Sequence, residues 1–121
     1  GQMSAQMRAL VDRGRAISKD EYTAAIANAK RYRSALLELL ADDSIIVAPA
    51  TDSFAPLRKE GTGSADIQAL YSLTGLPTLA VPCGMLQNLP VGVQLACAPG
   101  REQQLFFAAE ALSQPLRAAY R

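Results

Sequence analysis

The chain has 121 residues, of which 50% are hydrophobic, so it is long enough for one compact domain and too short for two. Its 12 basic and 11 acidic side chains are mixed along the chain and leave a formal charge of +1. This balance gives no reason to expect nucleic acid or a membrane surface as a partner. No apolar run approaches the roughly 20 residues that span a bilayer, and the first residues do not resemble a targeting segment. We therefore predict a cytoplasmic protein.

The composition also limits the chemistry. No histidine is present, which excludes Ser-His-Asp and Cys-His catalysis and removes the commonest metal ligand. Cys83 and Cys97 lie on different predicted strands and do not form a CxxC pair, so we predict small buried thiols, no metal site and no cofactor. A cysteine hydrolase built on Cys83 would lack a base to lower the pKa of its thiol.

The N-terminal part of the chain predicts two helices. Apolar residues at helical spacing predict a short helix over residues 3–14, ended by Gly14 in a left-handed cap. Ser18 and Glu21 have the spacing of a capping box, which predicts the start of a second helix. An apolar stripe continues this helix until the acidic break at residues 41–44.

The middle of the chain predicts a strand, a loop and a third helix. Residues 44–50 form a short apolar run rich in β-formers, which predicts a strand covered on both faces. The loop over residues 51–64 is long for a compact domain, which indicates a functional use. Ser64 is the predicted N-cap of the third helix, and Gly75 is predicted to end it.

The last third of the chain predicts a hairpin and a fourth helix. Two β-rich runs, at residues 78–83 and 91–97, are joined by a predicted loop of roughly five residues. Pro82 indicates that the first of these strands ends there or lies at a sheet edge. A final helix is predicted to begin after Gly100 and to end at Pro115. The fold class is therefore α/β, with about three strands, including the hairpin, and four helices.

The stretches "YSLTGLPTLAVPCG" and "LPVGVQLACAPGREQQLF" resemble the C-terminal part of the amidase signature family. Members of that family carry motifs of the type F-N-x-x-G-x-P-x-x-x-x-P-x-G and G-L-P-V-G-x-Q, and then a helix that begins near a Glu. The segment "IIVAPATDSFAP" also resembles the family's strand and following loop. The resemblance covers roughly residues 20–113, and Ser72 stands where the family usually has Asn. The matching positions are Gly75, Pro77, Pro82, Gly84, Pro90, Gly92, Gln94 and Glu102.

The resemblance implies that residues 1–121 are a single domain, the C-terminal portion of an amidase signature fold. It implies amide hydrolysis by a serine nucleophile, with a second serine and a lysine that move protons and with no metal. The Gly- and Ser-rich segment that carries these groups in the family has no match in this chain. The chain has three lysines, and none lies in a segment that matches the one around the family's catalytic lysine: Lys19, Lys30 and Lys59. We therefore assign no catalytic residue and expect the chain alone to be inactive.

The resemblance implies that this chain forms a wall of the substrate pocket. Thr51, Asp52 and Asp66 are the candidate residues for binding a small-molecule amide substrate in the full-length protein. In the alternative interpretation, Thr51 and Asp52 only form a local side-chain to backbone turn, and Asp66 only favours a helix N-terminus.

Two functions follow from these observations. In the first, the chain is the C-terminal segment of an amidase-family hydrolase and contributes scaffold and pocket wall. Three strands are few for four helices with apolar faces, so unpaired edges predict a homo-oligomer. In the second, the chain is a non-catalytic scaffold or complementation module that associates with another chain. The substrate stays open in both, because fold does not settle specificity.

Overall fold

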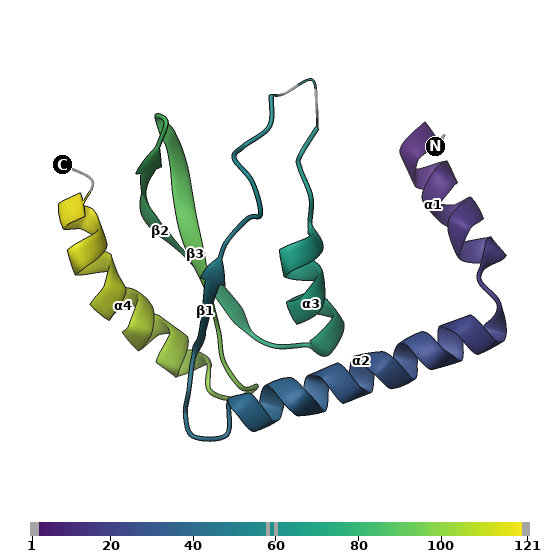
Figure 1. Ribbon diagram of the computed structural model, residues 1–121, viewed down its shortest axis with the longest axis horizontal. Helices are drawn as coiled ribbons and strands as arrows, with labels where there is room; N and C mark the ends of the chain where they lie inside the picture. The colour runs from purple at the N-terminus through teal and green to yellow at the C-terminus, as the bar shows by residue number, and fades with distance from the viewer. Residues whose placement is uncertain (1–2, 58, 60, 120–121) are drawn as a thin grey trace.

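The computed structural model describes residues 3–57, 59 and 61–119 (Figure 1). Arg58 and Glu60, which belong to the loop expected at residues 51–64, lie outside the described part. Within it, four helices and a three-stranded sheet confirm the predicted α/β class. In chain order the elements are α1 (Ala5–Ala16), α2 (Lys19–Leu39), β1 (Ile46–Pro49), α3 (Asp66–Thr74), β2 (Thr78–Leu86), β3 (Leu89–Ala96) and α4 (Glu102–Ala119).

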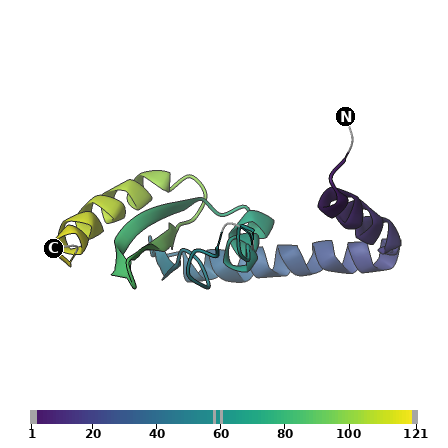
Figure 2. The same cartoon turned by 90° about the horizontal axis from the view of Figure 1, so that it is seen from above.

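The sheet has the order β1-β3-β2, and both neighbouring pairs are antiparallel. Successive side chains of β3 point to opposite faces, which divides the core into two clusters. Leu95 packs with Val81, Cys97 and Leu105 under α4. Ala96 packs on the other face in the cluster that also holds Leu40, Tyr71 and Leu76, beneath α2 and α3. Figure 2 shows α4 on the side of the sheet away from α2 and α3.

Strand β1 is covered on one face only, so the prediction that both faces are covered is wrong for this chain. Its side chains alternate: Ile46 and Ala48 are half-buried on the α3 side, whereas Val47 on the other side is 58% exposed. The reason is that α4 packs mainly against β2, at the opposite edge of the sheet. One apolar face of β1 is therefore left open.

The predicted helix boundaries were set by local bonds, and most of them are confirmed. Ser18 Oγ accepts from the Glu21 backbone N–H at 3.2 Å, and Glu21 Oε2 accepts from the Ser18 backbone N–H at 2.8 Å. The side-chain and backbone hydrogen bonds from Ser18 lower the pKa of Glu21. Gly75 ends α3 with φ 65°, whereas Gly14 does not end α1, which continues to Ala16. The last helix also extends past its expected end, to Ala119.

The hairpin turn is shorter than predicted. Strand β2 continues past Pro82 to Leu86 and β3 begins at Leu89, so two residues make the turn instead of roughly five. Gln87 and Asn88 have φ values of 52° and 61°, as a type I′ turn requires. Pro82 is tolerated because β2 lies at the sheet edge and its register shifts between Pro82 and Gly84.

The N-terminal arm, residues 5–28, extends away from the sheet (Figures 1 and 2). Helix α1 has no buried residue. The arm nevertheless carries large apolar side chains that are each at least 40% exposed, namely Met7, Leu10, Ile17, Tyr22 and Ile26. It is an amphipathic segment whose apolar side chains stay open to solvent in the part of the chain that the structure describes.

Candidate functional site

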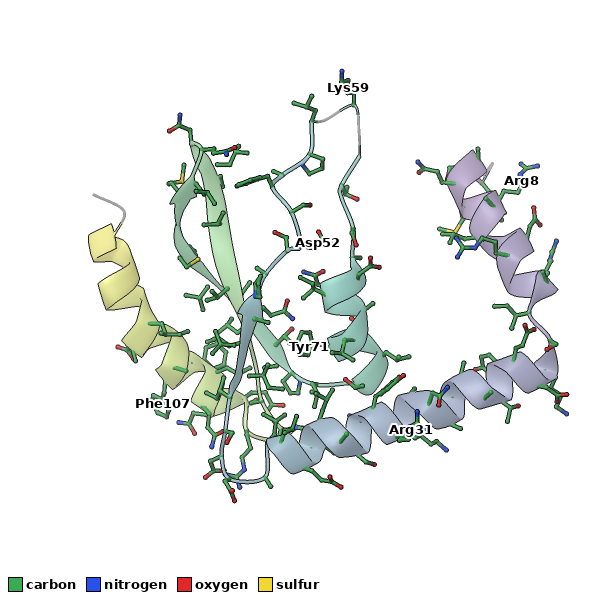
Figure 3. The ribbon with its side chains drawn as sticks, in the orientation of Figure 1. Arg8, Arg31, Asp52, Lys59, Tyr71 and Phe107 are labelled. Atoms are coloured by element: carbon green, nitrogen blue, oxygen red, sulfur yellow. The ribbon has the colours of Figure 1, made fainter. Side chains whose placement is uncertain are left out.

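Two adjoining cavities lie between the segment that follows β1 and the start of β3. We call them the loop cavities. The larger has a volume of about 380 Å³ and the smaller about 230 Å³. Figure 3 labels Asp52 in the segment that leads from β1 toward α3. Both cavities are lined by Thr51, Asp52, Ser53, Phe54 and Val91.

Local hydrogen bonds fix the polar side of the loop cavities. Thr51 Oγ1 donates to the Ser53 carbonyl oxygen at 2.9 Å, and Ser53 Oγ donates to Asp52 Oδ1 at 3.1 Å. These bonds make the local turn that the alternative interpretation expects. They engage only one carboxylate oxygen of Asp52, and the other is not used by the turn. A carboxylate beside the apolar walls of Phe54 and Val91 suits a small ligand with an N–H donor at one end.

Asp66 is placed differently from the other two candidates. It opens α3, where its backbone N–H donates to Ser64 Oγ at 3.0 Å, and Ala65 rather than Ser64 is the N-cap residue. Ser64 lines the smaller loop cavity, but Asp66 lines neither. The structure therefore brings Thr51 and Asp52 together at both loop cavities. It places Asp66 two residues after Ser64, outside the smaller cavity, where its charge favours the helix N-terminus.

Gly92 forms part of the floor of the larger loop cavity. Its carbonyl oxygen accepts from the Ala50 N–H at 2.9 Å, which joins the end of β1 to β3. A Cβ atom at Gly92 would lie 3.1 Å from the Val81 carbonyl oxygen and 3.5 Å from Ala50 Cβ. Glycine is thus needed for the close approach of these strands.

A third cavity, which the sequence did not reveal, lies between α3 and the sheet. We call it the α3 cavity, and its volume is about 320 Å³. Figure 3 shows Tyr71 on the side of α3 that faces the sheet. The lining residues come from four separate segments and are Ala50, Gln68, Tyr71, Ser72, Leu76, Thr78, Ala80 and Gln94. Two of these residues stand out in the sequence: Ser72, where the resemblance expects Asn, and Gln94, which matches the family motif.

The thiols do not form a reactive site. Cys97 is fully buried, and its burial, together with the charge of Glu102, raises the pKa of its thiol. Cys83 is half-buried beside the irregularity in β2. Among residues 3–57, 59 and 61–119, no group of three or more His, Cys, Asp or Glu side chains lies close enough to hold a metal ion.

The cysteines are expected to differ in reactivity. Iodoacetamide should modify Cys83 at least about tenfold faster than Cys97 at pH 8, because a buried thiol with a raised pKa supplies little accessible thiolate. Mass spectrometry of the digested protein after timed quenching would give both rates. Equal rates in the folded chain would contradict this expectation, and equal rates in urea provide the control.

The pKa of Cys97 also gives a direction for the pH dependence of stability. The pKa of the Cys97 thiol is higher in the folded chain than in the unfolded chain, so the folded state favours the protonated thiol. The stability that this preference contributes is fully present below the unfolded pKa of about 8.5. It is lost as the pH rises through the folded pKa. The alkaline fall in unfolding free energy should therefore be smaller in Cys97→Ala than in the unmodified chain.

Comparison with known proteins identifies the relatives of this chain. No protein-family model matches it. It is 36% identical over 114 residues to a glutamyl-tRNA(Gln) amidotransferase subunit of Anaeromyxobacter dehalogenans, which covers 84% of this chain and 23% of that protein. The same subunit from Clostridium kluyveri is 29% identical over 104 residues, which covers 78% of this chain and 21% of that protein. An amidase crystal structure matches with a TM-score of 0.77 at 26% identity.

The resemblance to the amidase signature family is confirmed. The amidase match covers 95% of this chain but only 29% of the matched chain. This chain likewise spans about a fifth of the length of the curated amidotransferase subunits. No helix in the described part of the chain is both long and apolar enough to cross a membrane.

Proposed function

We propose that this chain is the C-terminal segment of an amidase-family amide hydrolase, and that residues 1–121 form a single domain of it. The observation that carries the proposal is the amidase match, which includes nearly all of this chain and less than a third of the matched chain. The chain would supply scaffold and one wall of the substrate pocket. The serines and lysine of the reaction would come from elsewhere, since no residue here matches them.

The open apolar surfaces support this proposal. Val47 presents the uncovered face of β1, and Met7, Leu10 and Ile26 present the N-terminal arm, each at least 40% exposed. Large apolar side chains left exposed on separate faces of a chain are candidates for contact with another body. In the chain by itself, these surfaces and the two edge strands would instead favour self-association into a homo-oligomer.

The loop cavities are the proposed substrate wall. Asp52 would accept a hydrogen bond from an N–H group of a small-molecule amide, and the Thr51 turn would hold the carboxylate in place. Phe54 and Val91 would contact the apolar part of the substrate. Asp66 would act at longer range, through its charge beside the smaller cavity.

The first test concerns the chain alone. It should release no ammonia from a panel of small amides, including glutamine, and a fluorophosphonate probe should not label it. Labelling with turnover would overturn the proposal, because a nucleophile would then exist in a chain where none is assigned.

Sedimentation at several concentrations should show a growing dimer fraction, and a monomer at all concentrations would count against the argument from the exposed apolar surfaces.

The second test concerns the longer protein that would carry the serines and lysine. There, Asp52→Asn should lower kcat/KM for an amide substrate about tenfold to a hundredfold, since a charge-assisted hydrogen bond is weakened. Asp42→Asn is the matched control, because Asp42 is also an exposed carboxylate and lines neither loop cavity. Equal effects of the two substitutions would remove Asp52 from the proposed wall. Activity that needs a separate chain would instead favour the complementation module.

A further inference from the structure

A row of small side chains makes the sheet hollow beneath α3. Gln94 lies on the central strand, and its cross-strand partners are Ala48 on β1 and Ala80 on β2. Directly opposed residues of antiparallel strands point to the same face. On this face Ala50 and Gly92 continue the pattern of small residues toward the loop cavities. Ala50 and Ala80 line the α3 cavity, and their small side chains fill little of the space under the helix.

Gln94 is a buried residue whose side-chain amide lines this hollow. Only 5% of the residue is exposed, and its side chain donates and accepts no hydrogen bond within residues 3–57, 59 and 61–119. In the same range, every fully enclosed side-chain nitrogen or oxygen atom has a partner. The amide of Gln94 therefore retains access to the cavity that it lines. An amide that faces a cavity of low polarity makes a stronger hydrogen bond there than in water, so a ligand that enters the cavity can pair with it.

The other lining groups define the chemistry of such a ligand. Gln68 uses its Nε2 to donate to the Ala50 carbonyl oxygen, which leaves its Oε1 as an acceptor. Ser72 and Thr78 add hydroxyl groups, which donate and accept. Among the residues that the structure describes, no charged side chain lines this cavity. The cavity therefore suits an uncharged group with both a donor and an acceptor, and its apolar surface on Tyr71 and Leu76 suits a small hydrocarbon substituent.

We propose that the α3 cavity binds a carboxamide group, which pairs with the amide of Gln94 through two reciprocal hydrogen bonds. The α3 cavity shares no lining residue with the loop cavities, so this site is separate from the proposed substrate wall. Ser72 limits how much of the cavity the protein itself fills. An Asn at this position would carry a carboxamide of its own into the space that Ser72 leaves open.

Acetamide is the probe that tests this site. In spectra of the ¹⁵N-labelled chain, acetamide should cause saturable shifts of the Gln94 side-chain NH₂ signals and of the Ser72 and Ala80 backbone amides. Acetate, its charged analogue, should cause none. Ser72→Asn should abolish the acetamide response, whereas the matched control Ser34→Asn, on the exposed surface of α2, should leave it unchanged. Gln94→Leu should weaken apparent binding at least about tenfold, which corresponds to the loss of one good hydrogen-bond pair.

Several outcomes would overturn the proposal. One is the absence of a saturable shift in a chain whose spectrum remains that of a folded protein. Another is an equal response in Ser72→Asn and Ser34→Asn.

A second experiment, on the longer protein, distinguishes a free amide from an Asn or Gln side chain of another segment. If the longer protein shows the bound-state Gln94 signals without acetamide, the group comes from the protein, and if acetamide is required there too, it is free. Neither result depends on hydrolytic activity.

Discussion

Replacing Leu95 by Ala is expected to lower the free energy of unfolding by about 2–5 kcal/mol. Leu95 is fully buried on the central strand, in the cluster that joins β2 and β3 to α4. Its neighbours Val81 and Leu105 come from different elements, so they cannot collapse into the vacated space without moving the helix relative to the sheet. The loss therefore combines the transfer of the deleted atoms to water with the cost of a cavity.

Urea denaturation followed by circular dichroism would measure this loss. Leu86→Ala is the matched control, because Leu86 is 54% exposed at the tip of the hairpin and should change the unfolding free energy by no more than about 0.5 kcal/mol. A single domain of this size is usually stable by only about 5–15 kcal/mol. The loss in Leu95→Ala should therefore be a large part of the total and should clearly lower the urea midpoint, and a midpoint equal to that of Leu86→Ala would refute the assignment of the main core to this cluster.

The two clusters explain why the fold depends so strongly on few residues. Each face of the sheet is covered by one thin layer, α4 on one side and α3 with the end of α2 on the other. Much of the chain contributes little to either layer, since the N-terminal arm extends away from both. The stability of the loop cavities, which rest on β1 and β3, therefore derives mainly from the clusters around Leu95 and Ala96.

Sequence reasoning succeeded where a structural feature depends on neighbours in the chain. The capping box of Ser18 and Glu21 needs only two residues three positions apart, and the left-handed end of α3 needs only Gly75. Thr51 and Asp52 share a cavity largely because they are adjacent in the sequence. Their role toward a substrate stays a prediction, as does that of Asp66.

Sequence reasoning failed where the signal was weak or distant. A turn of Gln87 and Asn88 lacks the Gly that marks most type I′ hairpins, so the sequence predicts a longer turn than the structure has. Whether both faces of β1 are buried depends on where α4 packs, and no local sequence pattern reveals that position. The α3 cavity is lined by Ala50, Ala80 and Gln94 from three separate segments, and this juxtaposition requires the register of the sheet.

Replacing Gly75 by Ala is expected to cost about 2–3 kcal/mol. Part of the cost is conformational, because φ of 65° disfavours an L side chain by about 1–2 kcal/mol. The rest comes from Arg33, which reaches across from α2 and donates to the carbonyl oxygens of Thr74 and Gly75, the latter at 3.2 Å. A Cβ atom at Gly75 would lie 3.1 Å from Arg33 Nη1, so the guanidinium group would have to move.

Gly100→Ala separates the two contributions, because Gly100 also has a positive φ, of 84°, but a Cβ atom there would meet nothing within 4 Å. It should cost about 1–2 kcal/mol, the backbone term alone. In an Arg33→Met background the cost of Gly75→Ala should fall to that of Gly100→Ala, with a coupling energy of about 1 kcal/mol in urea denaturation. No coupling would mean that the contacts of Leu40 and Tyr71, rather than Arg33, hold α3 against α2. Coupling would instead show that one cation on α2 positions the helix that forms the roof of the α3 cavity, since it binds the last carbonyl groups of that helix.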